Sequence, residues 1–262
     1  LLTSDNDMVT FVYDGTFEGL LTAIFDAYFR RSFPDELVRI GEVLPMFSDE
    51  VHDVVTDDAK SSRVWNAVTK KLSKGAVSAV TTSFLCEVKE YDITLFRFLC
   101  KTINSPAGIE TDFSDQDVIE VLKMYRRVNG EAHRVLQFMR LQKAADGTYF
   151  GLMEPIYNVM PMAVSHFVDR FSTMSFLLYD KRRGFGFYYD GNNVTRVTMP
   201  DTLQHIVTGK LSEDMMDSDE MLFQKLWRTY FKAIAIKERS NPRKQRQDMP
   251  VRFWKYMTEK NG

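Results

Sequence analysis

Basic residues surround aromatic ones near the C-terminal end of the chain, in the segment NPRKQRQDMPVRFWK at residues 241–255. Guanidinium and ammonium groups bind phosphates, and aromatic faces stack on unpaired bases. The segment is therefore typical of a nucleic-acid-binding strand. Its candidate binding residues are Arg243, Lys244, Arg246, Arg252, Trp254 and Lys255. The alternative is a tail strapped across the acidic surface of its own domain, with Trp254 as an apolar anchor.

A second group of cations lies in the stretch Lys181-Arg182-Arg183-Gly184, between two predicted strands. Three cations in one turn cannot all find partners within the turn, so Arg182 and Arg183 are candidates for a phosphate clamp. Arg140 is expected to extend this clamp. Arg170 is a further candidate, either for binding nucleic acid or for holding charge at an active site. The alternative is a turn that is simply solvated.

His133 and His166 are candidates for acid–base catalysis, because imidazole titrates near neutrality. Asp180 or Glu154 could fix the tautomer of either ring, although nothing in the spacing requires these groups to meet. Structural histidines are the alternative. No HxH, HxxxH or HExxH spacing occurs, so no metal site is predicted, and no phosphate-binding glycine motif indicates a nucleotide cofactor.

The composition indicates a globular protein, with 262 residues, of which 44% are hydrophobic and 27% charged. The formal net charge is −2, but the charges are unevenly distributed. Residues 35–58 hold eight acids and one base, whereas residues 237–255 hold seven bases and two acids. The basic region is the one that we expect to meet nucleic acid.

The chain shows no sign of a membrane segment or a secretory signal. Its longest stretches without a charged residue, 75–86 and 155–168, are shorter than the roughly 18 apolar residues of a bilayer span. Cys86 and Cys100 lie in apolar surroundings, as is typical of reduced core cysteines. We therefore expect a cytoplasmic protein. Residues 1–7 lack an initiating Met and are expected to be disordered or foreign to the natural chain, with Met8 as its start.

The patterning predicts an α+β fold. A short strand over 8–13 ends at Asp14-Gly15, and Thr16 then caps a helix with an apolar face. Further helices are predicted over 57–104 and from Ser114 onward. The middle of the chain is predicted to be β-β-α-β-β, with strands over 135–143, 148–153, 175–179 and 185–189 and a helix over 160–171.

A long helix over 213–239 is expected to follow, with five apolar residues buried against the rest: Phe223, Trp227, Tyr230, Phe231 and Ile234. The prediction is thus a central antiparallel β-β-α-β-β unit flanked by N- and C-terminal helices. We expect one domain over 1–262, ending in a basic and aromatic tail at 240–262.

Several short motifs together resemble a bacterial family of unknown function. They are Tyr13-Asp14-Gly15-Thr16-Phe17-Glu18-Gly19-Leu20-Leu21, His166-Phe167 with Arg170-Phe171, Asp180 with Arg183, and Asn241-Pro242-Arg243 with Met249-Pro250, Arg252, Trp254 and Lys255. The family is described as a probable DNA metabolism protein associated with a radical-SAM protein, and the resemblance runs from about Val9 to Glu259.

The resemblance implies a radical-SAM partner encoded nearby that acts in DNA repair or modification, and it supplies no catalytic residue. Some members carry a uracil-DNA-glycosylase-like domain after this one. Because this chain has only two cysteines, it cannot hold a three-cysteine iron–sulfur cluster, so such redox chemistry would come from the partner.

Three functions remain open at this point. The first is a DNA-binding accessory that presents nucleic acid to the radical-SAM partner. The second is a metal-independent enzyme acting on DNA, and the third is a protein-interaction scaffold that binds no nucleic acid. No cofactor and no membrane partner are expected for any of them.

Overall fold

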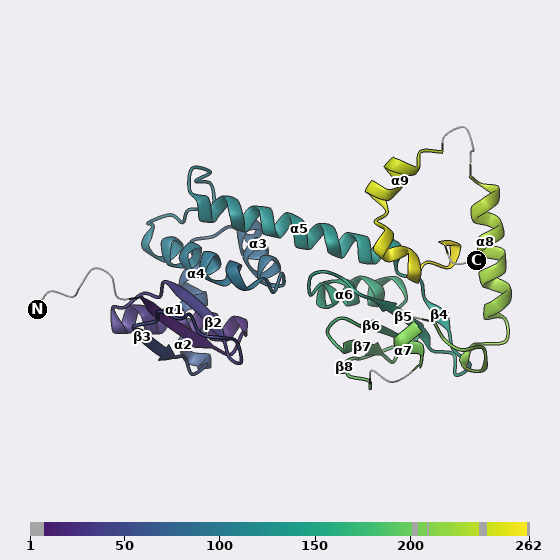
Figure 1. Cartoon of the computed structure of the whole chain (residues 1–262), viewed down its shortest axis with the longest axis horizontal. Coiled ribbons are helices and arrows are strands. Elements are labelled where there is room, and N and C mark those ends of the chain that lie inside the picture. The colour runs from purple at the N-terminus through teal and green to yellow at the C-terminus, as the bar shows by residue number, and fades with distance from the viewer. Residues whose placement is uncertain (1–7, 201–203, 209, 236–239, 261–262) are drawn as a thin grey trace, which may run out of the picture. The chain divides into compact units, whose positions relative to one another are not determined.

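The computed structural model describes residues 8–200, 204–208, 210–235 and 240–260. Helices and strands are both abundant, which confirms the α+β class (Figure 1). The sequence predicts one continuous domain, whereas the contacts group the chain into two compact units, Leu1–Val128 and Asn129–Gly262. We refer to them as unit 1 and unit 2 and describe each by itself. The predictions for residues 1–7, Lys237 and Arg239 lie outside the described residues.

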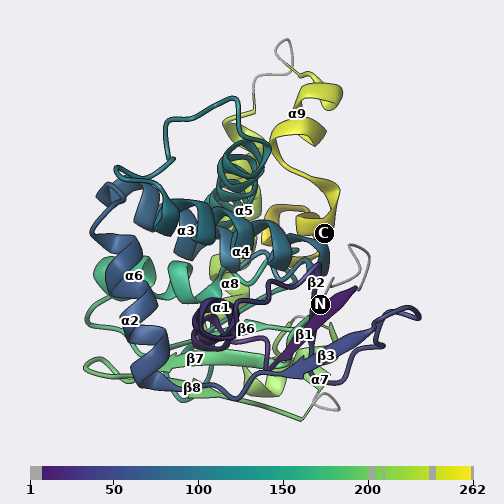
Figure 2. The same cartoon turned by 90° about the vertical axis from the view of Figure 1, so that its left-hand side faces the viewer.

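Unit 1 contains a three-stranded parallel sheet in the order β2-β1-β3, formed by β1 (Val9–Tyr13), β2 (Glu36–Arg39) and β3 (Glu50–Asp53). Figure 2 shows β1 between its two neighbours. The helix α1 (Phe17–Arg30) follows β1, and the Thr16 hydroxyl accepts a hydrogen bond from the Gly19 amide at 2.9 Å. The predicted strand, turn and capped helix are therefore confirmed, whereas β2 and β3 were not predicted.

Helices complete unit 1: α2 (Asp58–Thr69), α3 (Lys74–Phe84), α4 (Lys89–Asn104) and the first part of α5 (Gln116–Phe138). A largely buried network ties β1, β2 and α4 together. The Tyr13 hydroxyl donates to Asp92 on α4 at 2.6 Å, and Arg39 donates to the same carboxylate at 2.7 and 2.8 Å. Since both strands are tied to one carboxylate, α4 is fixed against the sheet.

The connection from β2 to β3 has no helix, although parallel strands are usually joined by one. Its large apolar side chains are exposed instead: Ile40, Val43, Leu44, Met46 and Phe47. We call residues 40–47 the apolar loop. Both of its ends are fixed by the sheet, because the Ile40 amide donates to the Tyr13 carbonyl and the Asp49 amide donates to the Met8 carbonyl. The ends of the apolar loop are thus fixed, while its side chains face solvent.

Unit 2 contains a five-stranded sheet in the order β4-β5-β6-β7-β8. Its strands are β4 (Gln142–Lys143), β5 (Tyr149–Met153), β6 (Phe176–Asp180), β7 (Phe185–Tyr189) and β8 (Val194–Val197). The helix α6 (Met160–Arg170) joins β5 to β6, which pair in parallel, while the other three pairs are antiparallel. The predicted order of strands and helix is found, but an entirely antiparallel sheet is not, because a helical crossover returns the chain in the same direction.

The predicted strand over 135–143 is mostly wrong. Residues up to Phe138 continue α5, and only Gln142 and Lys143 pair with β5. The alternation of apolar residues after Val135 coincides with the helical stripe that already places Val128 and Val135 in the core. The hairpin turn at Asp146-Gly147 is nevertheless present, with Gly147 at φ 85°.

The C-terminal part of unit 2 is built from short helices. They are α7 (Gln204–Thr208), η1 (Glu213–Met215), α8 (Glu220–Ala233), α9 (Pro242–Asp248), η3 (Val251–Tyr256) and η4 (Thr258–Lys260), where η marks a 3-10 helix. The predicted long helix is thus limited to α8. Its predicted burial is wrong, since Phe223 is 61% exposed and Trp227 is 40% exposed, and Tyr230 and Ile234 are exposed as well. Within the described ranges, no helix combines the length and apolar character needed to cross a membrane.

Candidate nucleic-acid interface

The predicted basic tail folds back onto unit 2. Phe253 is buried and packs against Phe138, with ring centroids 5.5 Å apart. Arg252 pairs with Glu131, and Lys255 pairs with Glu154. These contacts match the alternative of a tail strapped onto acidic residues of its own unit. The apolar anchor is Phe253, however, rather than the half-buried Trp254.

The bases of α9 lie on the surface. Lys244 forms an ion pair with Asp248 at 2.9 Å, and Arg246 donates to the Pro242 carbonyl at 3.1 Å. Arg243 makes no ion pair with any residue in the part of the chain that the structure describes. Of the six tail candidates, those on α9 therefore face solvent, as does Lys255, whose side chain is 55% exposed despite its ion pair.

The turn at Lys181–Arg183 divides its cations between two roles. Arg183 pairs with Asp180 at 2.8 Å and donates to the carbonyls of Pro155 and Ile156, so this guanidinium holds the turn together. The Arg182 side chain is exposed and lines a polar pocket of about 500 Å³ together with Arg252 and Lys255. Lys181 is half-buried and lies 3.7 Å from Glu154, so Arg182 is the cation of this turn that is exposed to solvent, as the clamp hypothesis requires.

The structure does not bring the three catalytic candidates together. His133 on α5 and His166 on α6 are exposed, and neither forms a hydrogen bond with Asp180 within the described residues. Asp180 is fully buried at the end of β6, where burial raises the pKa of its carboxyl above the usual range despite the ion pair with Arg183. No acid–base pair of the predicted kind is assembled.

Among the described residues there is neither a metal-binding cluster nor a reactive thiol. No group of three or more His, Cys, Asp or Glu residues there is placed to hold a metal ion. Both cysteines are buried, and burial raises the pKa of the Cys86 thiol to about 11 and that of Cys100 to about 12. The thiols are consequently protonated near neutral pH.

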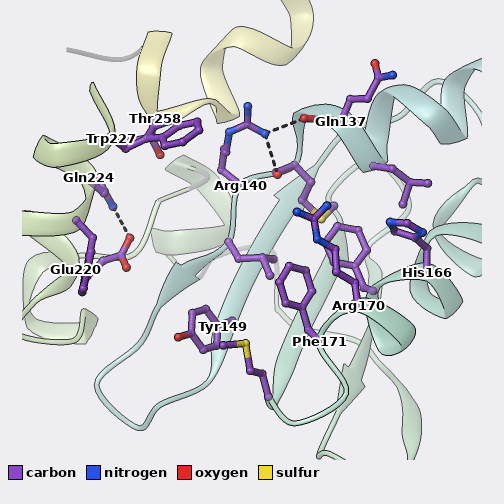
Figure 3. A pocket seen from close by; sticks show the side chains of 16 residues that line it. Gln137, Arg140, Tyr149, His166, Arg170, Phe171, Glu220, Gln224, Trp227 and Thr258 are labelled. Carbon is purple, nitrogen blue, oxygen red and sulfur yellow. Dashed lines mark hydrogen bonds between the residues drawn. The ribbon is translucent and has the colours of Figure 1, made fainter. Parts of the chain in front are cut away.

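Unit 2 contains a concave site of about 550 Å³, which we call the aromatic pocket. Figure 3 shows that side chains from α6 and α8 line different sides of it. Its apolar lining includes Leu141, Phe167, Phe171, Met174, Phe223 and Trp227. Its polar lining includes Gln137, Arg140, Tyr149, His166, Arg170 and Glu220. An apolar pocket with a few polar groups is typical of a ligand site.

Arg140 is part of the frame of this pocket. It donates to Glu259 at 2.6 and 3.3 Å and to the carbonyls of Gln137 and Met139 at 2.8 and 3.2 Å. The Trp227 indole donates to the same Glu259 carboxylate at 3.0 Å. Burial opposes ionisation of Glu259, but these hydrogen bonds hold the pKa of its carboxyl below the usual range. Arg140 was predicted to bind phosphate; in the structure its guanidinium donates to Glu259 and to two backbone carbonyls, and Glu259 also accepts the indole of Trp227 on α8.

Arg170 and His166 are two exposed polar residues that line the pocket. Both lie near the end of α6, and the Arg170 guanidinium sits over the Phe171 ring at 5.4 Å from the centroid. Within the described residues neither side chain pairs with a carboxylate. An accessible guanidinium supported by an aromatic ring is a suitable phosphate ligand.

The sequence analysis identified the basic residues of the aromatic pocket but not its aromatic residues. Trp227 and Phe223 were assigned to the core because they follow a helical stripe. The cations Lys225, Arg228 and Lys232 on the same helix were the available signal, since a basic amphipathic helix is typical of a binding surface.

Comparison with known proteins gives one match. No curated protein and no solved structure matches the chain significantly. A family model described as a domain of unknown function, DUF4130, matches residues 89–259. This range covers more than half of the chain and contains every residue of the aromatic pocket. The chain belongs to the DUF4130 family.

Proposed function

We propose that this protein acts in DNA metabolism, in repair or modification, as a nucleic-acid-binding accessory to a radical-SAM enzyme in the cytoplasm. The observation that supports the proposal most directly is the aromatic pocket, in which the exposed rings of Phe223 and Trp227 line the same cavity as Arg170 and His166. Exposed aromatic faces together with cations free of carboxylates are what single-stranded nucleic acid binds.

Exposed basic residues outside the pocket add further cations to this surface. Arg182 and Arg243 make no ion pair within the described residues, and Arg246 donates only to a backbone carbonyl. Each DNA phosphate that such a basic side chain contacts releases counterions, and the affinity therefore depends on salt. A DNA strand would thus gain affinity from several separate cations of unit 2.

The partner part of the proposal rests on the family resemblance and on unit 1. A chain whose two cysteines are both buried cannot supply the iron–sulfur cluster of radical-SAM chemistry. The apolar loop of unit 1 exposes five large apolar side chains beside Glu42 and Asp49, as a docking surface for another protein would. This loop equally favours an alternative function, that of a protein-interaction scaffold that binds no nucleic acid.

The test is DNA binding by fluorescence anisotropy, with single- and double-stranded oligonucleotides, between about 50 and about 200 mM salt. We expect binding that weakens steeply with salt and that Arg170→Ala weakens further. Arg127→Ala is the matched control, because Arg127 is an exposed base of unit 1 with no ion pair in the described residues. Co-expression with the adjacent radical-SAM protein tests the partnership. Absence of DNA binding, with the partner retained, would favour the scaffold.

A further inference from the structure

Two sides of the aromatic pocket present rings to the same space. Phe223 and Trp227 come from α8, while Phe171 follows α6. Figure 3 places Trp227 on the α8 side and Arg170 with His166 on the α6 side. A ligand that enters between them meets aromatic faces and a guanidinium at once. Such a ligand must combine a flat ring with a negative charge.

The polar groups of the pocket suit a ring that carries hydrogen-bonding edges. Tyr149, Gln137 and Thr258 line the pocket, and their side chains make no hydrogen bond with the rest of the described chain. Glu220, in contrast, already accepts hydrogen bonds from the Lys143 amide and the Gln224 amide. The pocket therefore retains donors and acceptors for a nucleobase edge, which a purely apolar ring would leave unpaired.

We propose that the aromatic pocket holds one unstacked nucleotide of a DNA strand, with its base against the rings of Phe223 and Trp227 and its phosphate on Arg170 and His166. This assignment rests on the proposed nucleic-acid binding and names the part of the strand that is recognised. The volume of about 550 Å³ lies within the range of about 300–1,000 Å³ that is usual for small-molecule sites. Stacking on an aromatic side chain offsets the cost of unstacking one base.

The frame of the pocket supports this role because it is fixed before a ligand arrives. Glu259 holds Trp227 and Arg140 together, and the carbonyls of Gln137 and Met139 accept hydrogen bonds from Nη1 of Arg140. Pre-organised rings lose little side-chain entropy on binding. The face of Trp227 is therefore available without rearrangement of its own hydrogen bond.

The experiment uses the full chain with its tryptophans replaced by 5-fluorotryptophan and follows them by fluorine NMR. The three resonances, from Trp65, Trp227 and Trp254, are assigned with Trp→Phe variants. The probes are a single-stranded DNA oligonucleotide, dTMP, thymidine and inorganic phosphate. We expect DNA and, more weakly, dTMP to shift the Trp227 resonance while that of Trp65 stays in place, and phosphate alone to have no effect.

Two variants with matched controls assign the contacts. Phe223→Ala should weaken binding of the oligonucleotide about tenfold through lost stacking, whereas Leu222→Ala, next to it on α8 and outside the pocket, should not. Arg170→Ala should weaken it at least about tenfold through the lost phosphate contact, and Arg127→Ala should not. Circular dichroism confirms that the variants are folded.

The outcomes separate this inference from the proposed function. If DNA binds with the expected salt dependence but neither moves Trp227 nor responds to Phe223→Ala, the pocket assignment is overturned and the proposed function stands. If dTMP moves Trp227 and DNA does not bind, the site belongs to free nucleotides, and both the strand assignment and the proposed function fail.

Discussion

Arg140 and Glu259 form a two-point ion pair although 119 positions separate them in the sequence. The Glu259 side chain is almost completely buried, and the Arg140 side chain is one-quarter exposed. Since the same carboxylate accepts the Trp227 indole, this pair links the segment after α5, the helix α8 and the last described residues of unit 2.

Arg140→Ala should lower the free energy of unfolding by about 3 kcal/mol, because it leaves the buried Glu259 carboxylate without its charged partner. Urea denaturation followed by circular dichroism measures the effect. Arg140→Lys, which keeps the charge and loses the two-point geometry, should fall between the wild type and Arg140→Ala. An unchanged midpoint for Arg140→Ala would show that the pair does not stabilise unit 2.

Asp117 makes the stability of unit 1 depend on pH. Burial opposes its ionisation, but Arg97 at 2.9 Å and Lys101 at 2.8 Å hold the pKa of the Asp117 carboxyl below its usual value of 3.8. The folded state thus favours the carboxylate. Its contribution is complete above that usual value and is lost as the pH falls through the lowered pKa.

The matching variant is Asp117→Asn, compared with the wild type by urea denaturation across the acid range. At pH 6 we expect the variant to be less stable by about 1 kcal/mol, a small figure because both cationic partners are nearly half exposed. As the pH falls through the lowered pKa of Asp117, the two proteins should converge. A difference that stays constant with pH would contradict the assignment to the charged form.

Gly186 and Gly130 should respond to alanine in opposite directions. A Cβ on Gly186 in β7 would lie 2.3 Å from the Leu178 carbonyl oxygen, so Gly186→Ala should destabilise the protein by about 2 kcal/mol or more. A Cβ on Gly130 within α5 meets no atom within 4 Å, so Gly130→Ala should stabilise the protein by about 0.5–1 kcal/mol. Thermal melting checks both, and equal effects would contradict the described packing.

Replacing Met46 and Phe47 together by serine should leave the free energy of unfolding within about 0.5 kcal/mol of the wild-type value, because the two residues are 89% and 78% exposed. The same change should reduce retention of the radical-SAM protein on co-expression. Phe29→Ser, on the end of α1 and 81% exposed, is the control that should retain it. Equal retention by all three proteins would exclude the apolar loop as the docking surface.

The parts of the fold that could be predicted are those encoded by neighbouring residues. The Thr16 cap, the apolar stripe of α1 and the turn at Asp146-Gly147 each depend on a few consecutive positions, and all three are present. The direction of β6, parallel to β5, could not be predicted from consecutive residues. It depends on the packing of α6 against the sheet, and an amphipathic stripe does not specify which strand a helix crosses.

Burial on α8 shows a second limit. The periodicity of Phe223 and Trp227 correctly indicated an amphipathic helix, but it does not reveal whether any surface covers the apolar face. The candidate site was only partly predictable for the same reason. Arg170 and His166 were identified from their chemistry, whereas their proximity to Trp227 arises only when α6 and α8 meet around the aromatic pocket.

The return of residues 252–259 onto residues 131–154 has a consequence for how the chain is made. Phe253 and Met257 fill the core of unit 2, and their charged neighbours neutralise Glu131 and Glu154, which are translated about a hundred residues earlier. A ribosome therefore produces the whole sheet of unit 2 well before the segment that closes it. During that interval the apolar surface awaiting Phe253 is open to chaperones, and folding of unit 2 concludes only after translation has passed residue 259.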